Sequence, residues 1–399
     1  MEFIEAWSAD EGAQRVAEGF KKTFGTEPAG VWQAPGRVNI IGEHTDYNQG
    51  LCAPIALPHR TYVAVSPEPE ADVVRLASAQ APGVWEIAMN EVVPGKVKGW
   101  GAYVAGTVWG MRGLGLEAPG ITGYVDSCVP FGAGLSSSAA LSCSFAVALE
   151  DLSREAGDIT CTTDVRKQLV KAAMAAENQI VGAPTGGLDQ SASLLAEQDH
   201  VLIIDFLDFS THQVPFDLKA AGLELLVIDT RAKHELSDGQ YGSRRAQSEA
   251  AAKKLGIPSL RYADDLAAAM KILGPDTVEG KRARHVITEI ARVRDFEAAL
   301  KAGDWAAMGP LFAASHASLR YDYEVTVPEL DVAVEAALAN GATAARMTGG
   351  GFGGSVIALI PTGEAAKIAD GVDKEFAKNG FGAPAFLTAF ASGPAGAVD

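Results

Sequence analysis

The strongest candidate for chemistry in this sequence is a glycine- and serine-rich loop. Residues 129–140 read VPFGAGLSSSAA, and an apolar helical pattern follows, with Leu141, Phe145 and Leu149 on one face. A glycine-rich turn that leads into a helix binds anions, because backbone N–H groups point outward and the helix dipole adds positive charge. The serine hydroxyls are also suited to cap the helix. We expect phosphate contacts from Gly132, Gly134, Leu135, Ser136, Ser137 and Ser138.

The loop alone leaves a structural alternative open, which is a glycine turn followed by an ordinary serine cap. It is not a Walker A loop, because no lysine follows the last glycine. A Rossmann motif would need an acidic residue at the end of a second strand about 20 positions later. Glu150 and Asp151 lie near that distance, but they come at the end of a predicted helix. The sequence therefore disfavours a dinucleotide-binding fold.

A second cluster of polar side chains follows a short predicted strand at residues 38–41. Carboxylates accept hydrogen bonds from hydroxyl groups, while histidine and asparagine side chains both donate and accept. Such a cluster directly after a buried strand is typical of a sugar site, although a surface turn closed by its own side chains would have the same composition. The side chains are those of Glu43, His44, Asp46, Tyr47 and Asn48.

Two acidic residues, twelve positions apart, form a third candidate. Glu177 falls late on a helix predicted over residues 167–180, and Asp189 opens another helix after a Thr-Gly-Gly turn. Taken by themselves, one is equally well a solvated helix residue and the other a helix cap.

Length and charge limit the classes of protein that fit. A chain of 399 residues suggests roughly two domains. A formal net charge of −17 argues against nucleic acid or an anionic membrane as partner, so any cation that faces a phosphate must be local. The four cysteines have neither zinc nor disulfide spacing, and we find no signal peptide and no apolar run long enough for a membrane. We expect a cytoplasmic protein, with a monomer as the default.

The remaining elements are expected from periodicity and from turn residues. Residues 11–25 read as an amphipathic helix, and residues 61–65 and 73–77 as strands that could form a hairpin. A second glycine-rich loop over residues 349–354 precedes a strand and implies a close backbone approach. We expect the chain to cross between domains over residues 211–222 and to fray over residues 391–399.

Two of these motifs resemble those of a known family. Residues 36–48, GRVNIIGEHTDYN, resemble the sugar-recognition motif of galactokinases. Residues 130–140, PFGAGLSSSAA, resemble the phosphate loop of the wider superfamily that also holds homoserine, mevalonate and phosphomevalonate kinases. The resemblance covers nearly the whole chain. It implies an α+β fold with a ribosomal-protein-S5-like lobe at residues 1–210, a C-terminal α+β lobe at residues 211–399, and an active site in the cleft between them.

The resemblance also implies an activity and a role for each candidate residue. The activity is ATP-dependent phosphorylation of galactose at its anomeric hydroxyl, with Mg²⁺ as cofactor. Asp189 would be the catalytic base and Arg37 its catalytic partner, Ser138 and Glu177 would hold Mg²⁺, and Trp100 would lie near the adenine. Residues 185–190 read TGGLDQ where the family usually has CGIMDQ, so the base is kept and the pocket wall differs. The sugar would be bound by Arg37, Glu43, His44, Asp46, Gly187, Asp189 and Tyr241.

Two alternatives to this activity stay open. Small changes near Asp46 or Tyr241 would suit N-acetylgalactosamine or arabinose instead of galactose. A non-catalytic regulator that binds galactose and ATP would use the same fold, but such relatives tend to lose residues of the phosphate loop. The complete run of residues 136–140 and the presence of Asp189 favour an enzyme.

Overall fold

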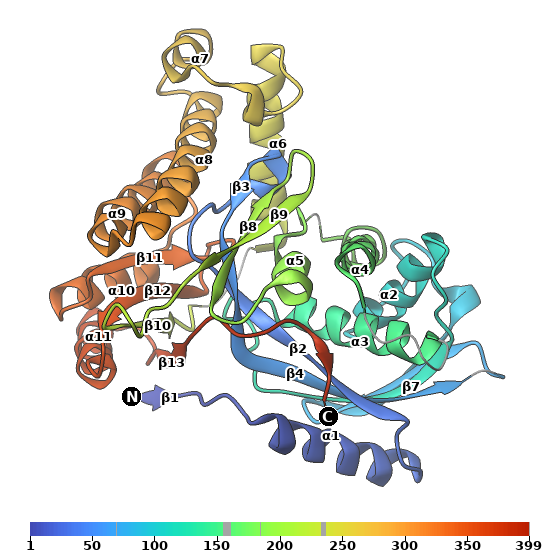
Figure 1. The fold of residues 1–399 in the computed structure, drawn as a ribbon. Helices are drawn as coiled ribbons and strands as arrows, with labels where there is room; N and C mark the ends of the chain where they lie inside the picture. Colours follow the sequence, from blue (N-terminus) through green and yellow to red (C-terminus); the bar gives the residue numbers. More distant parts are fainter. Residues whose placement is uncertain (69, 155–160, 184, 233–236, 399) are drawn as a thin grey trace.

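The chain folds into two lobes, each built on one main β-sheet (Figure 1). The computed structural model describes residues 1–68, 70–154, 161–183, 185–232 and 237–398. Among these residues, no helix is both long enough and apolar enough to cross a membrane.

The N-terminal lobe contains a six-stranded sheet with the order β14-β2-β4-β7-β5-β6. All neighbouring strands are antiparallel except β5 and β7, which run parallel. The register of β2 against β4 shifts between Pro35 and Arg37, so the strand has a bulge at Gly36. The strands are β2 (Gly30–Asn39), β4 (Pro54–Glu68), β5 (Val73–Ser78), β6 (Ala81–Ala88), β7 (Gly120–Ser127) and β14 (Gly396–Ala397).

Helices cover both faces of this sheet (Figure 1). The predicted first helix is confirmed as α1 (Ala9–Phe24), which begins at a Ser8 cap and buries Val16 and Phe20. The phosphate loop leads into α3, whose serines and alanines allow close packing on β2. The helices of the opposite face are α2 (Ala102–Gly113), α3 (Ser137–Ser153), α4 (Thr163–Ala175) and α5 (Leu188–Leu195).

The predicted hairpin between residues 61–65 and 73–77 is wrong. Both segments are strands, but β7 lies between them and pairs with each. The short connection between the two segments favoured a hairpin, whereas the chain instead returns through α2 and places β7 in the middle of the sheet.

The C-terminal lobe has a five-stranded sheet with the order β1-β13-β10-β12-β11. Its strands are β1 (Glu2–Phe3), β10 (Leu223–Asp229), β11 (Ala344–Thr348), β12 (Ser355–Pro361) and β13 (Ala385–Ala389). Its helices are α6 (Ser237–Leu255), α7 (Leu266–Leu273), α8 (Val278–Ala302), α9 (Met308–Ser318), α10 (Pro328–Ala339) and α11 (Ala365–Asn379).

A small third sheet joins the two lobes, with the order β3-β8-β9. Its strands are β3 (Leu51–Cys52), β8 (His200–Asp205) and β9 (Ser210–Pro215). The predicted crossing over residues 211–222 is therefore partly a strand, and only the turns after β9 lead irregularly into β10. Val38, Ile40 and Ile41 are fully buried in the same apolar core as the C-terminal sheet, so the polar loop that follows them begins at a fixed point between the lobes.

The predicted fraying of residues 391–399 is wrong for the part of the tail that the structure describes. β14 pairs with β2, so the C-terminal strand lies in the N-terminal lobe, while β1 pairs with β13 in the other lobe. Arg60 fixes this tail by donating to Ser392 Oγ at 2.8 Å and to the carbonyl of Pro394 at 3.1 Å. The sequence of the tail gives no sign of this anchoring, because the partner, Arg60, lies far away in the sequence.

Candidate functional site

An ion pair between Arg37 and Asp189 lies at the centre of the site. Arg37 follows the bulge of β2, and Asp189 is in the first turn of α5. Nε and Nη2 of Arg37 lie 2.8 and 2.6 Å from Oδ1 of Asp189, and Nη1 donates to the carbonyl of Gly134 at 2.6 Å. The backbone N–H of Arg37 donates to the carbonyl of Leu135 at 3.1 Å. These contacts hold the phosphate loop, the cation and the carboxylate together.

Ser136 differs from the expected helix cap. It stands at the N-cap of α3 with a φ of 62°, and its side chain makes no capping hydrogen bond. Its hydroxyl donates to Oδ2 of Asp189 at 2.6 Å instead. Left-handed backbone is costly for a residue other than glycine, and such strain is common where a side chain is held for function.

A polar cavity of about 140 Å³ lies on one side of this ion pair. The polar loop after β2, the start of α5, one residue of α6 and the second glycine loop surround it. All seven residues predicted to bind the sugar line this cavity. They are Arg37, Glu43, His44, Asp46, Gly187, Asp189 and Tyr241.

The hydrogen bonds of His44 define its protonation. Nε2 lies 3.1 Å from the carbonyl of Gly350, and Nδ1 lies 2.8 Å from the hydroxyl of Tyr47. Because a carbonyl only accepts, Nε2 carries the proton and Nδ1 accepts from Tyr47. Burial, aided by the nearby His285, lowers the pKa of His44 to about 3, so the ring is neutral.

The acidic side chains of the cavity are shifted in the opposite direction. Burial raises the pKa of Asp46 to about 6, and the charges of Asp189 and Glu43 add to this effect. Burial also raises the pKa of Glu43, against the lowering influence of Arg346 and of a hydrogen bond from Asn39. A ligand hydroxyl that donates a hydrogen bond to one of these buried carboxyl groups would stabilise its ionised form.

A second cavity, of about 450 Å³, lies on the other side of the ion pair. It shares Arg37, Asp189, Tyr241 and Gly350 with the first cavity. The second glycine loop forms its far wall, and Ser355 Oγ donates to the carbonyl of Ala133 at 2.7 Å, which ties this loop to the first. All six predicted phosphate-loop residues line it, namely Gly132, Gly134, Leu135, Ser136, Ser137 and Ser138.

The two glycine loops approach each other as closely as the sequence suggested. A side chain at Gly349 would place its Cβ 3.1 Å from the carbonyl oxygen of Gly134. Gly349 and Gly351 also have φ values of 85° and 78°, which glycine alone adopts without strain. The run of glycines therefore serves the contact between the lobes.

Glu177 and Ser138 are brought together from different helices. Glu177 lies in a π-helical segment, Ala176–Val181, and its Oε1 accepts from Ser138 Oγ at 3.3 Å. Its Oε2 accepts from Thr185 Oγ1 and Gln190 Nε2 at 2.9 and 2.6 Å. Burial raises the pKa of Glu177 to about 7, and the charge of Asp189 adds to this effect. A bound cation would stabilise the ionised carboxylate and so lower the pKa of Glu177.

Trp100 lines a third cavity of about 400 Å³ that adjoins the second one. Ser137 and Ser138 belong to the walls of both cavities, so the three cavities follow one another along the cleft. The lining of the third is mainly apolar, with Tyr103 and Phe131 beside Trp100. Phe131 is exposed, as expected of a side chain at the mouth of a pocket.

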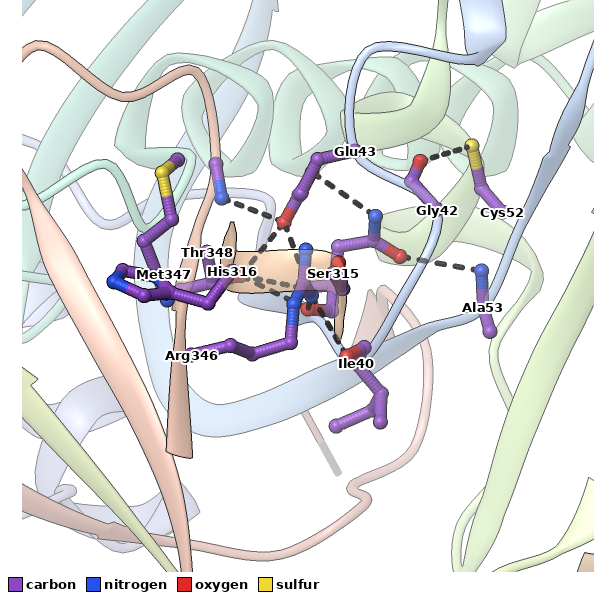
Figure 2. Close-up of polar contacts among 12 residues, drawn as sticks. Ile40, Gly42, Glu43, Cys52, Ala53, Ser315, His316, Arg346, Met347 and Thr348 are labelled. Atoms are coloured by element: carbon purple, nitrogen blue, oxygen red, sulfur yellow. Dashed lines mark hydrogen bonds and ion pairs between the residues drawn. The ribbon is translucent and has the colours of Figure 1, made fainter. Parts of the chain in front are cut away.

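Sequence reasoning missed a buried charge cluster behind the polar cavity. Arg346 on β11 and Glu289 on α8 are both fully buried. Arg346 lies beside Glu43 (Figure 2), and Glu289 forms an ion pair with Arg346. An arginine before a glycine loop and a glutamate on a long helix have no local pattern that would mark them. Only the packing of β11 and α8 against the end of β2 brings them together.

The part of the chain that the structure describes contains no group of three or more His, Cys, Asp and Glu side chains able to hold a metal. Its four cysteines are free, as predicted, and three of them are buried.

Comparison with known proteins identifies the family to which the chain is similar. Residues 18–67 match the galactokinase galactose-binding signature, and residues 102–197 and 296–378 match the N-terminal and C-terminal domains of GHMP kinases. A galactokinase of Streptomyces coelicolor is 45% identical over 385 residues, which cover 95% of this chain and 97% of the relative. The galactokinase of Homo sapiens is 40% identical over 351 residues, 86% of each chain.

Solved structures agree with these relatives. Lactococcus lactis galactokinase in complex with galactose has a TM-score of 0.87 and 32% identity, over 95% of this chain and 98% of that one. A mevalonate kinase has a TM-score of 0.61 at 15% identity, which supports the fold alone. With the sugar motif, the phosphate loop and this likeness over nearly its whole length, the chain belongs to the galactokinase family.

Proposed function

We propose that this chain transfers the γ-phosphoryl group of ATP to the anomeric hydroxyl of galactose, giving galactose 1-phosphate and ADP. The observation that carries the proposal is the position of Arg37 and Asp189 in the shared wall of the two cavities. A hydroxyl group in the polar cavity and a phosphate in the glycine-serine cavity would meet at this pair. Galactokinase relatives at 40–45% identity support the same reaction.

Asp189 would receive the proton of the attacking hydroxyl. A carboxylate has about four acceptor sites, and the contacts from Arg37 and Ser136 leave room for one more hydroxyl group. As the proton moves to Asp189, the sugar oxygen bonds to the γ-phosphorus, and the oxygen between the β- and γ-phosphorus leaves with its electron pair on ADP. Arg37 supplies positive charge beside the transferred group, which this reaction requires.

The phosphate loop would bind the ATP phosphates through its backbone N–H groups at the start of α3. Ser137 and Ser138 continue into the third cavity, so a phosphate chain held there would direct the adenine toward Trp100 and Tyr103. The flat aromatic surface of Trp100 suits a base, and the apolar lining excludes water from it.

Ser138 and Glu177 fit Mg²⁺ as the cofactor. Ser138 lines the phosphate cavity, and Glu177 lies behind it with Oε1 3.3 Å from the serine hydroxyl, so the two residues offer two oxygen atoms. Mg²⁺ typically takes one or two protein oxygens together with substrate phosphates. When bound, the ion would neutralise phosphate charge during transfer. Thr185 and Gln190 orient the Glu177 carboxylate through its other oxygen.

The candidate site residues named above all belong to one chain, which is consistent with a monomer, and the use of ATP together with free thiols is consistent with the cytoplasm. The polar cavity, of about 140 Å³, suits a single small sugar.

The test is a panel of galactose, N-acetylgalactosamine, arabinose and glucose, each incubated with Mg²⁺ATP and followed by ADP release and phosphorus NMR. We expect turnover on galactose and a product whose phosphate is on the anomeric carbon. Turnover on arabinose or N-acetylgalactosamine alone would keep the mechanism and change the substrate. Galactose binding without ADP release would overturn the proposal in favour of a regulator.

A further inference from the structure

Arg346 lies in a buried position behind the polar cavity, where it contacts the end of β2. Nη1 donates to the carbonyl of Ile40 at 2.7 Å (Figure 2). It also donates to the carbonyl of Asn39 at 3.1 Å. The side chain is fully buried, so these two carbonyls take the place of water around Nη1, while Nε and Nη2 have no hydrogen-bond partner among the residues that the structure describes. The polar loop with Glu43, His44 and Asp46 begins immediately after this point.

Two carboxylates flank the guanidinium group of Arg346. Nη1 lies 3.7 Å from Oε1 of Glu43, and Nη2 lies 3.7 Å from Oε1 of Glu289. Glu289 is held firmly by other donors, since its Oε1 accepts from Gly42 N at 3.0 Å and from Ser315 Oγ at 2.7 Å. Glu289 therefore fixes Arg346 from behind, and Arg346 faces Glu43 from the side opposite the cavity.

Glu43 connects this cluster to the cavity. Its Oε2 accepts from Asn39 Nδ2 at 3.0 Å, and its Oε1 accepts from Gly349 N at 2.8 Å. Thr348 Oγ1 lies 3.2 Å from the same Oε1, but its single proton is shared with the carbonyl of Asn39. The protein donors thus leave an acceptor site of the carboxylate free for a ligand that enters the cavity.

We infer that Arg346 is a positioning residue of the sugar site, which holds the end of β2 and the Glu43 carboxylate against the second glycine loop so that Glu43 accepts a hydrogen bond from a sugar hydroxyl. The inference rests on the proposed function for the identity of the ligand. Arg346 does not line any of the three cavities and so acts through Glu43.

The electrostatic surroundings of Glu43 agree with this role. Burial raises the pKa of Glu43, and the charge of Arg346 is the largest of the influences that lower it. Removing that charge would raise the pKa further and favour the protonated acid, which donates where the carboxylate accepts. The other titratable or charged groups around Glu43 are Arg37, His44 and Asp46 from its own segment, Cys52 from β3, and His285 and Glu289 from α8.

The test uses Arg346→Met and Arg346→Lys, with galactose and ATP varied separately over a range of pH. We expect Arg346→Met to raise the KM for galactose by about tenfold or more, as loss of a hydrogen bond to a charged group does, with little change in the KM for ATP. As the pH is lowered, kcat/KM for galactose should begin to fall at a higher pH in this variant than in the wild type. Arg346→Lys keeps the charge and should restore much of the pH profile.

Two further variants separate positioning from general loss of stability. Arg60→Met removes a partly buried arginine that anchors the C-terminal tail and lines none of the three cavities, and it should leave the KM for galactose unchanged. Glu43→Gln should show the galactose defect, and adding Arg346→Met to it should cause little further loss and no further shift of the acid limb.

The positioning role would be overturned by an unchanged pH profile in Arg346→Met. It would also be overturned if kcat fell and the KM values for galactose and for ATP rose by the same factor. Additive defects in the double variant would also overturn it. If Arg346→Met does not fold, Arg346→Lys still decides. Lysine keeps the charge, and so most of the pH profile, but it lacks the guanidinium group that faces both carboxylates, so its KM for galactose should rise. A wild-type KM for galactose in Arg346→Lys would contradict the inference. Failure of the wild type to phosphorylate galactose would overturn the proposed function instead, and it is seen before any variant is compared.

Discussion

The guanidinium group of Arg37 contacts one oxygen of Asp189 through both Nε and Nη2, at 2.8 and 2.6 Å, although the two residues are 152 positions apart. The bulge of β2 directs Arg37 to this point, and the first turn of α5 supplies Asp189. Because the pair separates a polar cavity from a glycine-serine cavity, it defines where two substrates would meet.

Replacing Trp100 with leucine tests the third cavity. Stacking of a base on an aromatic side chain contributes about 1–3 kcal/mol, so we expect the KM for ATP to rise about tenfold or more while the KM for galactose stays constant. Trp109→Leu is the matched control, because Trp109 packs against the core and does not line the cavity. An unchanged KM for ATP in Trp100→Leu would place the adenine elsewhere.

Glu177 should make Mg²⁺ activation depend on pH. Burial and the charge of Asp189 raise the pKa of Glu177 to about 7, and a protonated carboxyl group holds the ion poorly. The free Mg²⁺ needed for half-maximal ADP release should therefore decrease as the pH rises from 6 to 8. Glu177→Gln, measured in parallel, should need more Mg²⁺. Its Mg²⁺ requirement should also depend less on pH, because the titration of Glu177 no longer contributes. The same pH dependence in both proteins would exclude Glu177 as a ligand.

Gly186 lies so close to Asp46 that a side chain at this position would disturb the polar cavity. A Cβ at this position would lie 2.3 Å from Oδ2 of Asp46, so Gly186→Ala must displace that carboxylate or its own loop. We expect a higher dissociation constant for galactose by calorimetry. Gly113→Ala, where nothing lies within 4 Å of the added carbon, is the control and should bind normally. Normal galactose binding by Gly186→Ala would show that Asp46 is not needed in its present position.

Asp46 should contribute to galactose binding but decrease the free energy of unfolding at neutral pH. Burial raises its pKa from the ordinary 3.8 to about 6, so the folded chain binds the proton more tightly than the unfolded chain does. The free energy of unfolding therefore decreases, through this group, as the pH rises across that window, and the loss is complete above it.

Asp46→Asn removes this penalty. We expect the variant to bind galactose poorly, and to exceed the wild type in free energy of unfolding by more at pH 8 than at pH 4. Urea titrations of both proteins at the two pH values measure this difference. A difference that does not change with pH would contradict the assigned shift.

The sequence predicted the parts of the site that lie in contiguous motifs. The polar loop after β2 and the loop before α3 each place several chemical groups within a few residues, so composition and spacing suffice to find them. The same local reasoning misjudged Ser136, because its φ of 62° turns the hydroxyl from the helix toward Asp189. A cap and a contact across the cleft have the same local sequence.

Features that depend on distant partners were beyond such reasoning. The insertion of β7 between β4 and β5, and the pairing of β14 with β2, are decided by long-range packing and not by turn residues. Arg346 is the clearest case, because its charge is compensated by residues that lie 57 and 303 positions away, Glu289 and Glu43.

The most direct test of the account is a single-turnover measurement on Asp189→Asn, with enzyme in excess over Mg²⁺ATP and saturating galactose. We expect the variant to bind galactose and ATP but to form ADP more slowly by a factor of about 10² to 10⁴, the range for loss of a general base. Ser136→Ala, which removes only one hydrogen bond to Asp189, should be affected far less. ADP formation by Asp189→Asn within a few-fold of the wild-type rate would contradict the placement of Asp189 at the reacting centre.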